Sequence, residues 1–181
     1  MTKALIFNDI FINNNKLAKI LSPYFEFEIY DRQENINRFQ CLIGIGSGCF
    51  QLLEKAEQNK FKKDIFLISC YLDFDRFLHW TPQASHEEIA LKIGIDNDIV
   101  DKNYCLSKLA GRKYFLDKDK FKCRFHLIYS LDNKMFDTND ALKIVDLIDY
   151  PRLHVFEEGG FAPILKFPEY ISNLISGECK E

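Results

Sequence analysis

The sequence lacks any uninterrupted apolar run approaching the ~18 residues that a membrane-spanning helix requires. The apolar stretch near its amino terminus, Ala4–Phe7, is too short for a signal peptide and is followed directly by Asn8 and Asp9. A basic surplus is also missing, because 24 Lys and Arg are set against 27 Asp and Glu, for a formal net charge of −3. These absences argue against a membrane span and against binding of nucleic acid or anionic membranes. They predict a cytoplasmic protein.

Paired metal-binding cysteine motifs are absent as well. The cysteines are Cys41, Cys49, Cys70, Cys105, Cys123 and Cys179. None forms a CxxC or Cys/His pair, and several lie in apolar runs, where a reduced thiol packs as a small hydrophobic group. Asp9, Asp31 and Asp132 follow predicted strands, but carboxylates on unrelated loops are weak evidence for a cation site. We therefore predict neither a metal nor a cofactor.

What the sequence does contain is an alternation of short apolar runs and helical patterns. The predicted strands are Lys3–Phe7, Phe25–Tyr30, Cys41–Ile45, Ile65–Cys70, Phe125–Tyr129 and Leu153–Phe156. The predicted helices are Lys16–Leu21, Cys49–Gln58, Thr138–Ile148 and Pro168–Ile175. Continuous apolar strands separated by helices are typical of a mostly parallel sheet covered on both faces. The 181 residues are thus predicted to form one three-layer α/β/α domain with about six strands.

Residues 72–122 do not follow that alternation. They contain the single tryptophan, Trp80, two of the four histidines, His79 and His86, and a helical pattern at Glu87–Ile93. Because the segment follows the fourth predicted strand, we expect a small helical cap or lid over the carboxyl edge of the sheet.

A glycine-rich turn follows the third predicted strand, at the sheet edge where ligands of parallel α/β folds bind. It reads Gly44-Ile-Gly-Ser-Gly48 and leads into a helix. The turn matches neither GxGxxG nor GxxxxGK[ST], so a phosphate-binding loop is disfavoured. It does match the outer glycines of the nucleophile elbow G-x-S-x-G, in which Gly46 takes the place of the serine.

With these residues in view, the chain resembles the α/β-hydrolase superfamily along most of its length. Phe125–Lys134 is similar to the family's seventh strand and acid loop, which implies Asp132 as the triad carboxylate. Arg152–Pro163 is similar to the final strand and its Gly-His-Ala-Pro ending, which implies Phe161 at the position of the catalytic histidine. The length and the glycine at the elbow most resemble the small YqiA/YcfP-like esterases.

The same resemblance implies an oxyanion hole and a substrate pocket. Asn8 and Asp9 stand where the family usually has His-Gly, and the backbone N–H of Ser47 would normally serve the oxyanion. The residues that we assign to the oxyanion hole and pocket are Asn8, Asp9, Ile10, Ser47 and Cys70.

The implied triad lacks two of its three functional groups. Gly46 offers no nucleophile, Phe161 cannot take a proton, and Asp132 would orient no base. His126 and His154 lie inside predicted strands, so each is expected roughly 10 Å or more from the active edge. A degraded triad is therefore the prediction.

Neighbouring groups are the alternatives for catalysis. Ser47, one residue past the apex of the elbow, is either a substitute nucleophile or an N-terminal residue that caps the following helix. Cys49 and Cys70 are candidate thiol nucleophiles, although buried packing accounts for them better. His79 and His86, in the predicted cap, are the candidate substitute bases.

Three functions remain open. The first is a catalytically degenerate relative of carboxylesterases and thioesterases that acts as a binding module for a small acyl-type ligand. The second is a working esterase or thioesterase that uses Ser47 or a cysteine with a cap histidine. The third is a non-enzymatic interaction subunit, suggested by the 17 phenylalanines.

Overall fold

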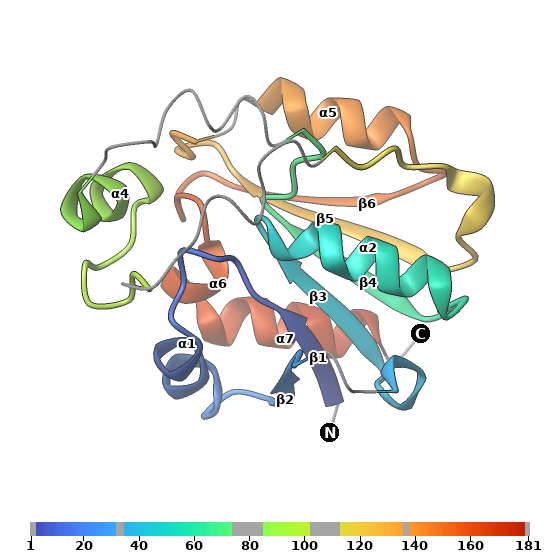
Figure 1. The fold of residues 1–181 in the computed structure, drawn as a ribbon, viewed down its shortest axis with the longest axis horizontal. Helices are drawn as coiled ribbons and strands as arrows, with labels where there is room; N and C mark the ends of the chain where they lie inside the picture. The colour runs from blue at the N-terminus through green and yellow to red at the C-terminus, as the bar shows by residue number, and fades with distance from the viewer. Residues whose placement is uncertain (1–2, 32–34, 74–84, 102–112, 136–137, 180–181) are drawn as a thin grey trace.

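A computed structural model describes residues 3–31, 35–73, 85–101, 113–135 and 138–179. Its centre is one sheet of six strands: β1 (Lys3–Phe7), β2 (Glu26–Ile29), β3 (Cys41–Ile45), β4 (Asp64–Ile68), β5 (Arg124–Ser130) and β6 (Arg152–Phe156). The strand order is β2-β1-β3-β4-β5-β6, and every neighbouring pair is parallel. The predicted parallel α/β/α fold is therefore confirmed (Figure 1).

Helices cover both faces of the sheet. The α-helices are α1 (Asn14–Leu21), α2 (Gly48–Gln58), α4 (His86–Ile93), α5 (Thr138–Asp146), α6 (Pro163–Lys166) and α7 (Pro168–Glu178), and short 3-10 turns lie at η1 (Ile36–Arg38) and η3 (Lys118–Lys120). One face of the sheet packs against α1, α6 and α7, and the other packs against α2 and α5. No helix among the described residues is long and apolar enough to span a membrane.

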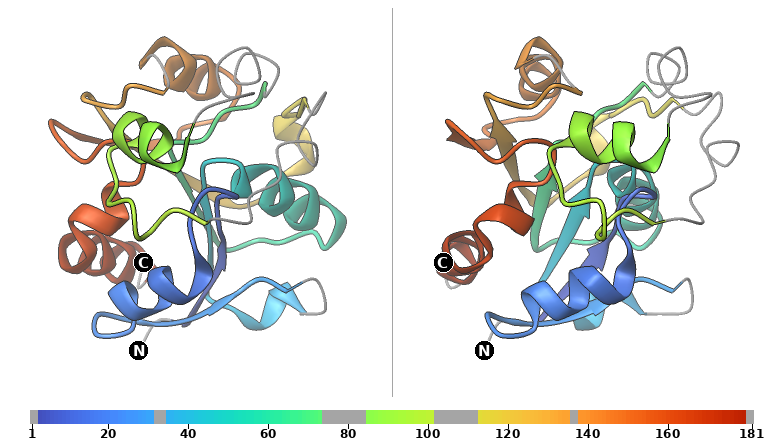
Figure 2. Two further views of the ribbon diagram at one scale, coloured as in Figure 1. Left: turned by 60° about the vertical axis from the view of Figure 1, so that its left-hand side comes forward. Right: turned by 90° about the vertical axis from the view of Figure 1, so that its left-hand side faces the viewer.

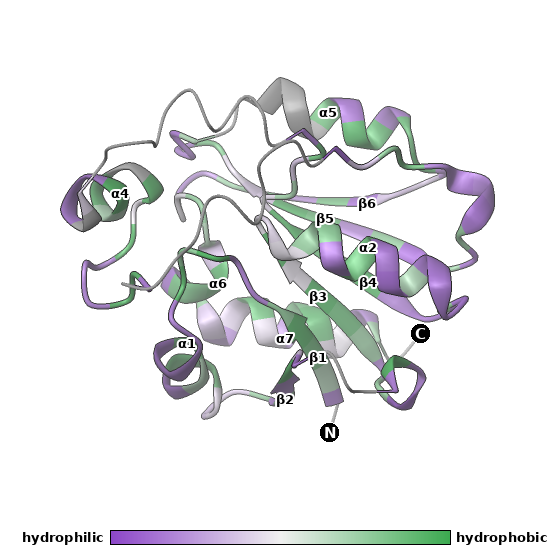
Figure 3. Ribbon diagram, in the orientation of Figure 1, coloured by the Kyte–Doolittle hydropathy of each residue, from purple (hydrophilic) through white to green (hydrophobic). Residues whose placement is uncertain are grey.

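The alternation of side chains along each strand divides the core in two. In β3, Ile43 and Ile45 point into the cluster beneath α1 and α7, whereas Leu42 points into the cluster beneath α2. Every residue of β3 and β4 is buried. The sequences of these strands are therefore nearly continuous apolar runs, because both faces of the sheet are covered. Figure 3 shows β1 and β3 coloured mostly as hydrophobic.

Several predicted boundaries were wrong. The fourth strand begins at Asp64 and ends at Ile68, since Ser69 takes a left-handed φ of 47° that a strand cannot continue through. The helix predicted at Thr138–Ile148 ends at Asp146. The four-residue α6, which begins with Pro163 in its first turn, was not predicted because so short a segment has no measurable period.

Part of the predicted cap lies within the described residues. Ser85 caps helix α4: its hydroxyl accepts a hydrogen bond from the Glu88 N–H, and the Glu88 carboxylate accepts from the Ser85 N–H. Ile89 and Ile93 of α4 are buried against the core. Figure 2 shows α4 at the end of the sheet toward which the strands point. The full extent of the cap, residues 72–122, stays a prediction, because residues 74–84 and 102–112 lie outside the described part of the chain.

Candidate active site

The turn after β3 has the backbone of a nucleophile elbow. Gly46 adopts a left-handed φ of 50°, a conformation that costs little only for glycine. Its N–H donates to the carbonyl of Ile68 at 2.9 Å, which joins the turn to the end of β4. Helix α2 then begins at Gly48, only two residues after the apex. A strand, a left-handed apex and an immediate helix form the layout that presents the nucleophile in α/β-hydrolases.

Other groups fill the place of a nucleophilic side chain at that apex. A Cβ atom built on Gly46 would lie 2.2 Å from Cζ of Phe161 and 2.3 Å from Oδ2 of Asp9. Both distances are far below van der Waals contact. Phe161 is completely buried and Asp9 nearly so. The loop after β6 therefore delivers an aromatic ring, and the loop after β1 a carboxylate, to the point where a seryl side chain would begin.

Ser47 is held by the loop after β1. Its hydroxyl donates to Asp9 Oδ2 at 2.7 Å and accepts from the Ile10 N–H at 3.1 Å. The expectation that Ser47 caps α2 was wrong: its backbone is already helical and its side chain makes no capping hydrogen bond. The side chain instead turns toward Asp9, whose carboxylate is the stronger acceptor.

The carboxylate of Asp9 accepts two backbone hydrogen bonds, one of them from the residue that the resemblance implies as the oxyanion donor. The backbone N–H of Ser47, the implied oxyanion donor, donates to Asp9 Oδ2 at 2.6 Å, and the N–H of Phe11 donates to Asp9 Oδ1 at 2.8 Å. Burial raises the pKa of Asp9 to about 6, although these hydrogen bonds oppose the rise. A carboxylate of the protein itself thus accepts the hydrogen bond that a reaction oxyanion would need.

Asn8 fixes the loop that carries Asp9. Its side-chain oxygen accepts from the Asp9 N–H at 2.9 Å, and its amide nitrogen donates to the carbonyl of Ile12 at 2.7 Å. Local side-chain bonds of this kind set the path of a turn. Asn8, Asp9, Ile10 and Ser47, which were assigned together from the sequence, are joined in one hydrogen-bond network.

The acid loop and the final loop also meet. Asp132, which follows β5, accepts a hydrogen bond from the backbone N–H of Gly160 at 2.8 Å. The next residue, Phe161, donates its own N–H to the carbonyl of Ile93 at the end of α4. Asp132 therefore orients the backbone beside Phe161.

The remaining candidates from the sequence are two histidines, proposed as bases, and two cysteines, proposed as nucleophiles. His79 and the side chain of His86 lie outside the described residues, so their role as bases stays a prediction. Cys49 and Cys70 are completely buried. Burial, together with a hydrogen bond that the Cys49 thiol donates to Cys70, raises the pKa of Cys49 well above its usual value, so Cys49 stays a thiol.

The carboxyl edge also holds two serines, Ser69 and Ser130, that follow the fourth and fifth predicted strands and were site candidates by that position alone. Ser69 is completely buried in its left-handed conformation, and its hydroxyl accepts from the Asn133 side chain at 3.3 Å. The Ser130 hydroxyl is buried without a hydrogen-bond partner among the described residues. Their place at the ends of β4 and β5 was the only available signal, because a single serine has no distinguishing pattern.

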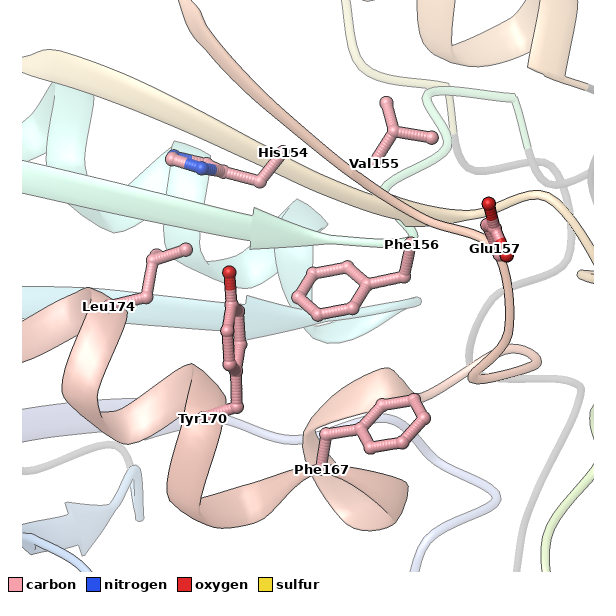
Figure 4. Close-up of a pocket in the computed structure, with 7 residues that line it drawn as sticks. All are labelled: His154, Val155, Phe156, Glu157, Phe167, Tyr170 and Leu174. Carbon is pink, nitrogen blue, oxygen red and sulfur yellow. The ribbon is translucent and has the colours of Figure 1, made fainter.

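A cavity of about 500 Å³ lies between β6 and α7. Its lining residues are His154, Val155, Phe156, Glu157, Phe167, Tyr170 and Leu174. Phe156 stacks parallel to Phe167 and meets Tyr170 edge-on, so aromatic rings form much of the wall (Figure 4). The volume falls within the range of small-ligand sites.

A second polar cluster lies at the opposite, amino end of the sheet. His126 Nε2 is 2.9 Å from Oδ1 of Asp64, the first residue of β4, and the same oxygen accepts from Arg124 Nε at 2.9 Å. His154 stacks beside His126, with ring centroids 5.9 Å apart. Burial lowers the pKa of both imidazoles, so both are neutral at pH 7. Neither histidine belongs to the elbow.

No protein-family model and no curated protein matches this sequence. Solved structures do match over nearly the whole chain. A lipase-esterase related protein from Clostridium acetobutylicum superposes with a TM-score of 0.75 at 14% identity, covering 97% of this chain and 93% of that one. A meta-cleavage product hydrolase from Pseudomonas fluorescens gives 0.67 at 12%, covering 98% and 90%. A carboxylesterase from Bacillus subtilis gives 0.64 at 10%, covering 98% and 83%. The chain has the α/β-hydrolase fold.

Proposed function

We propose that this protein is a non-hydrolytic member of the α/β-hydrolase fold that acts by binding a ligand. The observation that carries the proposal is the occupied elbow: Phe161 and Asp9 fill the volume that a side chain at Gly46 would need. Acyl transfer requires a nucleophile in contact with a base. Here the apex has no side chain, and the residue pressed against it is a phenylalanine.

The hydrogen bonds of Ser47 also favour this proposal over an enzyme that uses Ser47. Its hydroxyl already donates to Asp9, a carboxylate, and it is 3% exposed. Asp9 also engages the N–H of Ser47, so the donor that would stabilise a tetrahedral oxyanion is satisfied in the resting protein. A substrate carbonyl would have to displace a buried carboxylate before it could react.

Activity measurements test the proposal directly. Purified protein is assayed with p-nitrophenyl butyrate and with a short acyl-thioester, and is treated with a fluorophosphonate probe. We expect no turnover above background and no labelling. Turnover of ~1 s⁻¹ or more, an ordinary enzyme rate, would overturn the proposal if it is lost in Ser47→Ala and kept in Ser172→Ala. Ser172 is a matched control because it is an equally buried serine on α7.

The ligand that we propose is a small acyl-type molecule, bound in the cavity between β6 and α7. The aromatic lining and the volume of about 500 Å³ support an apolar chain of modest length. Titration calorimetry with octanoate tests this assignment. Leu174→Trp, which fills the cavity, should weaken binding by tenfold or more, whereas Leu91→Trp, on the exposed face of α4, should leave it unchanged. Equal affinities in the two variants would remove the cavity from the proposal.

A further inference from the structure

The amino end of the sheet brings together three side chains that can ligate a metal. His126 and His154 lie on neighbouring strands, and the register, which pairs Ile128 with His154, places both on the face covered by α7. Figure 4 shows His154 on β6 beside that helix. Glu178 is the last residue of α7. One ligand atom from each of the three residues lies within 4.8 Å of the other two.

Two imidazole nitrogens at this point are buried without a hydrogen-bond partner among the described residues, namely His126 Nδ1 and His154 Nε2. His126 is completely buried. Its Nε2 faces Asp64, whose carboxylate also receives two hydrogen bonds from Arg124 and is therefore an acceptor. Nε2 must then carry the proton, which leaves the lone pair on Nδ1. Buried unpaired groups are rare in folded proteins and require a reason.

We propose that His126, His154 and Glu178 bind a zinc ion. Two neutral imidazoles and one carboxylate form a three-ligand set that zinc takes in proteins, with the fourth position open to water or to a ligand. Ligand atoms of a tetrahedral zinc are about 3.4 Å apart. Small rotations of the side chains would bring these three groups to that spacing from their present separation.

The surroundings favour a cation at this place. Asp64 stands behind His126 as the carboxylate that commonly orients a metal-ligating imidazole and increases its basicity. Glu178 lies at the carboxyl end of α7, which carries partial negative charge. The carbonyl of Glu178 already accepts a hydrogen bond from Arg124 at 3.1 Å, which shows that the helix end attracts positive charge.

The two arginines of the cluster do not oppose the ion strongly. Arg124 is paired with Asp64 and Arg152 with Glu178, so each positive charge is matched by a carboxylate. Both arginine side chains are more than 40% exposed, and water therefore screens them. A carboxylate offers several lone pairs, so Glu178 can ligate zinc while it keeps Arg152.

The site lies at the opposite end of the sheet from Gly46 and does not depend on the proposed loss of hydrolysis. The test uses the full chain, with any affinity tag removed, after treatment with EDTA. Zinc is titrated against a chromogenic chelator, and cobalt is titrated separately, because Co²⁺ in a tetrahedral site has visible absorption bands. We expect one zinc per chain with submicromolar affinity and a cobalt spectrum of nitrogen and oxygen ligation.

Three variants decide the assignment. His154→Gln and Glu178→Gln should each weaken zinc binding by tenfold or more, since each removes a ligand from a partly exposed position while the strand and helix remain. Glu169→Gln, an exposed glutamate at the other end of α7, is the matched control and should bind like the wild type. Circular dichroism verifies that all three variants fold.

Unchanged affinity in either ligand variant would overturn the proposal. A thiolate-to-cobalt charge-transfer band that disappears in Cys41→Ser/Cys179→Ser would also overturn it, because the ion would then sit on the neighbouring thiols. Those two thiols interact with each other, and Cys179 follows Glu178 directly in the chain, so they are the competing ligands to exclude.

Discussion

Replacing Gly46 with alanine tests whether the elbow is truly filled. The new Cβ would lie 2.2 Å from the Phe161 ring and 2.3 Å from the Asp9 carboxylate, on a backbone with a left-handed φ of 50°. Strain of that backbone costs about 1–3 kcal/mol, and overpacking of a rigid core costs about another 1–3 kcal/mol. Gly46→Ala should therefore lower the free energy of unfolding by about 2–6 kcal/mol.

Urea unfolding followed by circular dichroism measures that loss, and thermal melting should shift downward by about 4 °C or more for a chain of this size. Gly177→Ala is the matched control. Nothing lies within 4 Å of a Cβ at Gly177, and the residue is in helix α7, so alanine should leave stability unchanged or raise it by up to about 1 kcal/mol.

A double-mutant cycle identifies the cause of the loss. Phe161→Leu removes the Cζ atom that the new methyl group would strike, so Gly46→Ala should cost less in that background than in the wild type. The reasoning would be refuted by a loss below about 1 kcal/mol in the single variant, or by strictly additive costs in the cycle.

Three further predictions each rest on one side chain and its hydrogen bonds. The folded-state pKa of Asp9 is about 6, against 3.8 for the free group, so the folded protein binds this proton more tightly. The contribution of Asp9 to stability is therefore greatest below pH 4 and falls by up to about 3 kcal/mol as the pH rises through 6. Asp9→Asn should flatten that fall in urea unfolding at pH 4–7, and an unchanged slope would contradict the assignment. Asp64→Ala should cost about 2–3 kcal/mol because it leaves His126 unpaired, and a neutral result would contradict the burial argument. Ser85→Ala should cost about 1 kcal/mol through loss of the capping box with Glu88, as amide hydrogen exchange in α4 can show; unaltered exchange would argue against it.

The strands could be predicted because of where they lie. A strand such as β3, buried on both faces, needs apolar residues at every position, so it stands out in one sequence without any relative for comparison. The short α6 has no such signature. The end of β4 was misplaced because the left-handed turn at Ser69 comes from its hydrogen bond to β5 and its packing, whereas the residue type itself disfavours that conformation.

The candidate site, like the fold, could be predicted only in part from the sequence. Topology predicted that Asn8, Asp9 and Ser47 would gather at the carboxyl edge, since the ends of parallel strands meet there, and the family resemblance added Ile10. It could not predict that Asp9 would bond to Ser47, because that contact joins residues 38 positions apart through side-chain packing alone. The cluster of His126, His154 and Glu178 escaped the search for metal-binding motifs for a related reason. Its members come from three separate elements, so they have no common spacing.

The outer glycines of the elbow show that packing alone can account for part of a catalytic motif. A Cβ at Gly48 would lie 2.0 Å from the carbonyl oxygen of Phe7, and one at Gly44 would lie 2.9 Å from Sγ of Cys49. Both glycines are therefore required by the close approach of α2 to strands β1 and β3, whether or not a nucleophile stands between them. Packing therefore accounts for the two outer positions of G-x-S-x-G whatever residue stands at the apex. Within the motif, only the apex residue would take part in catalysis. At that apex, Phe161 and Asp9 occupy the space that a side chain at Gly46 would need.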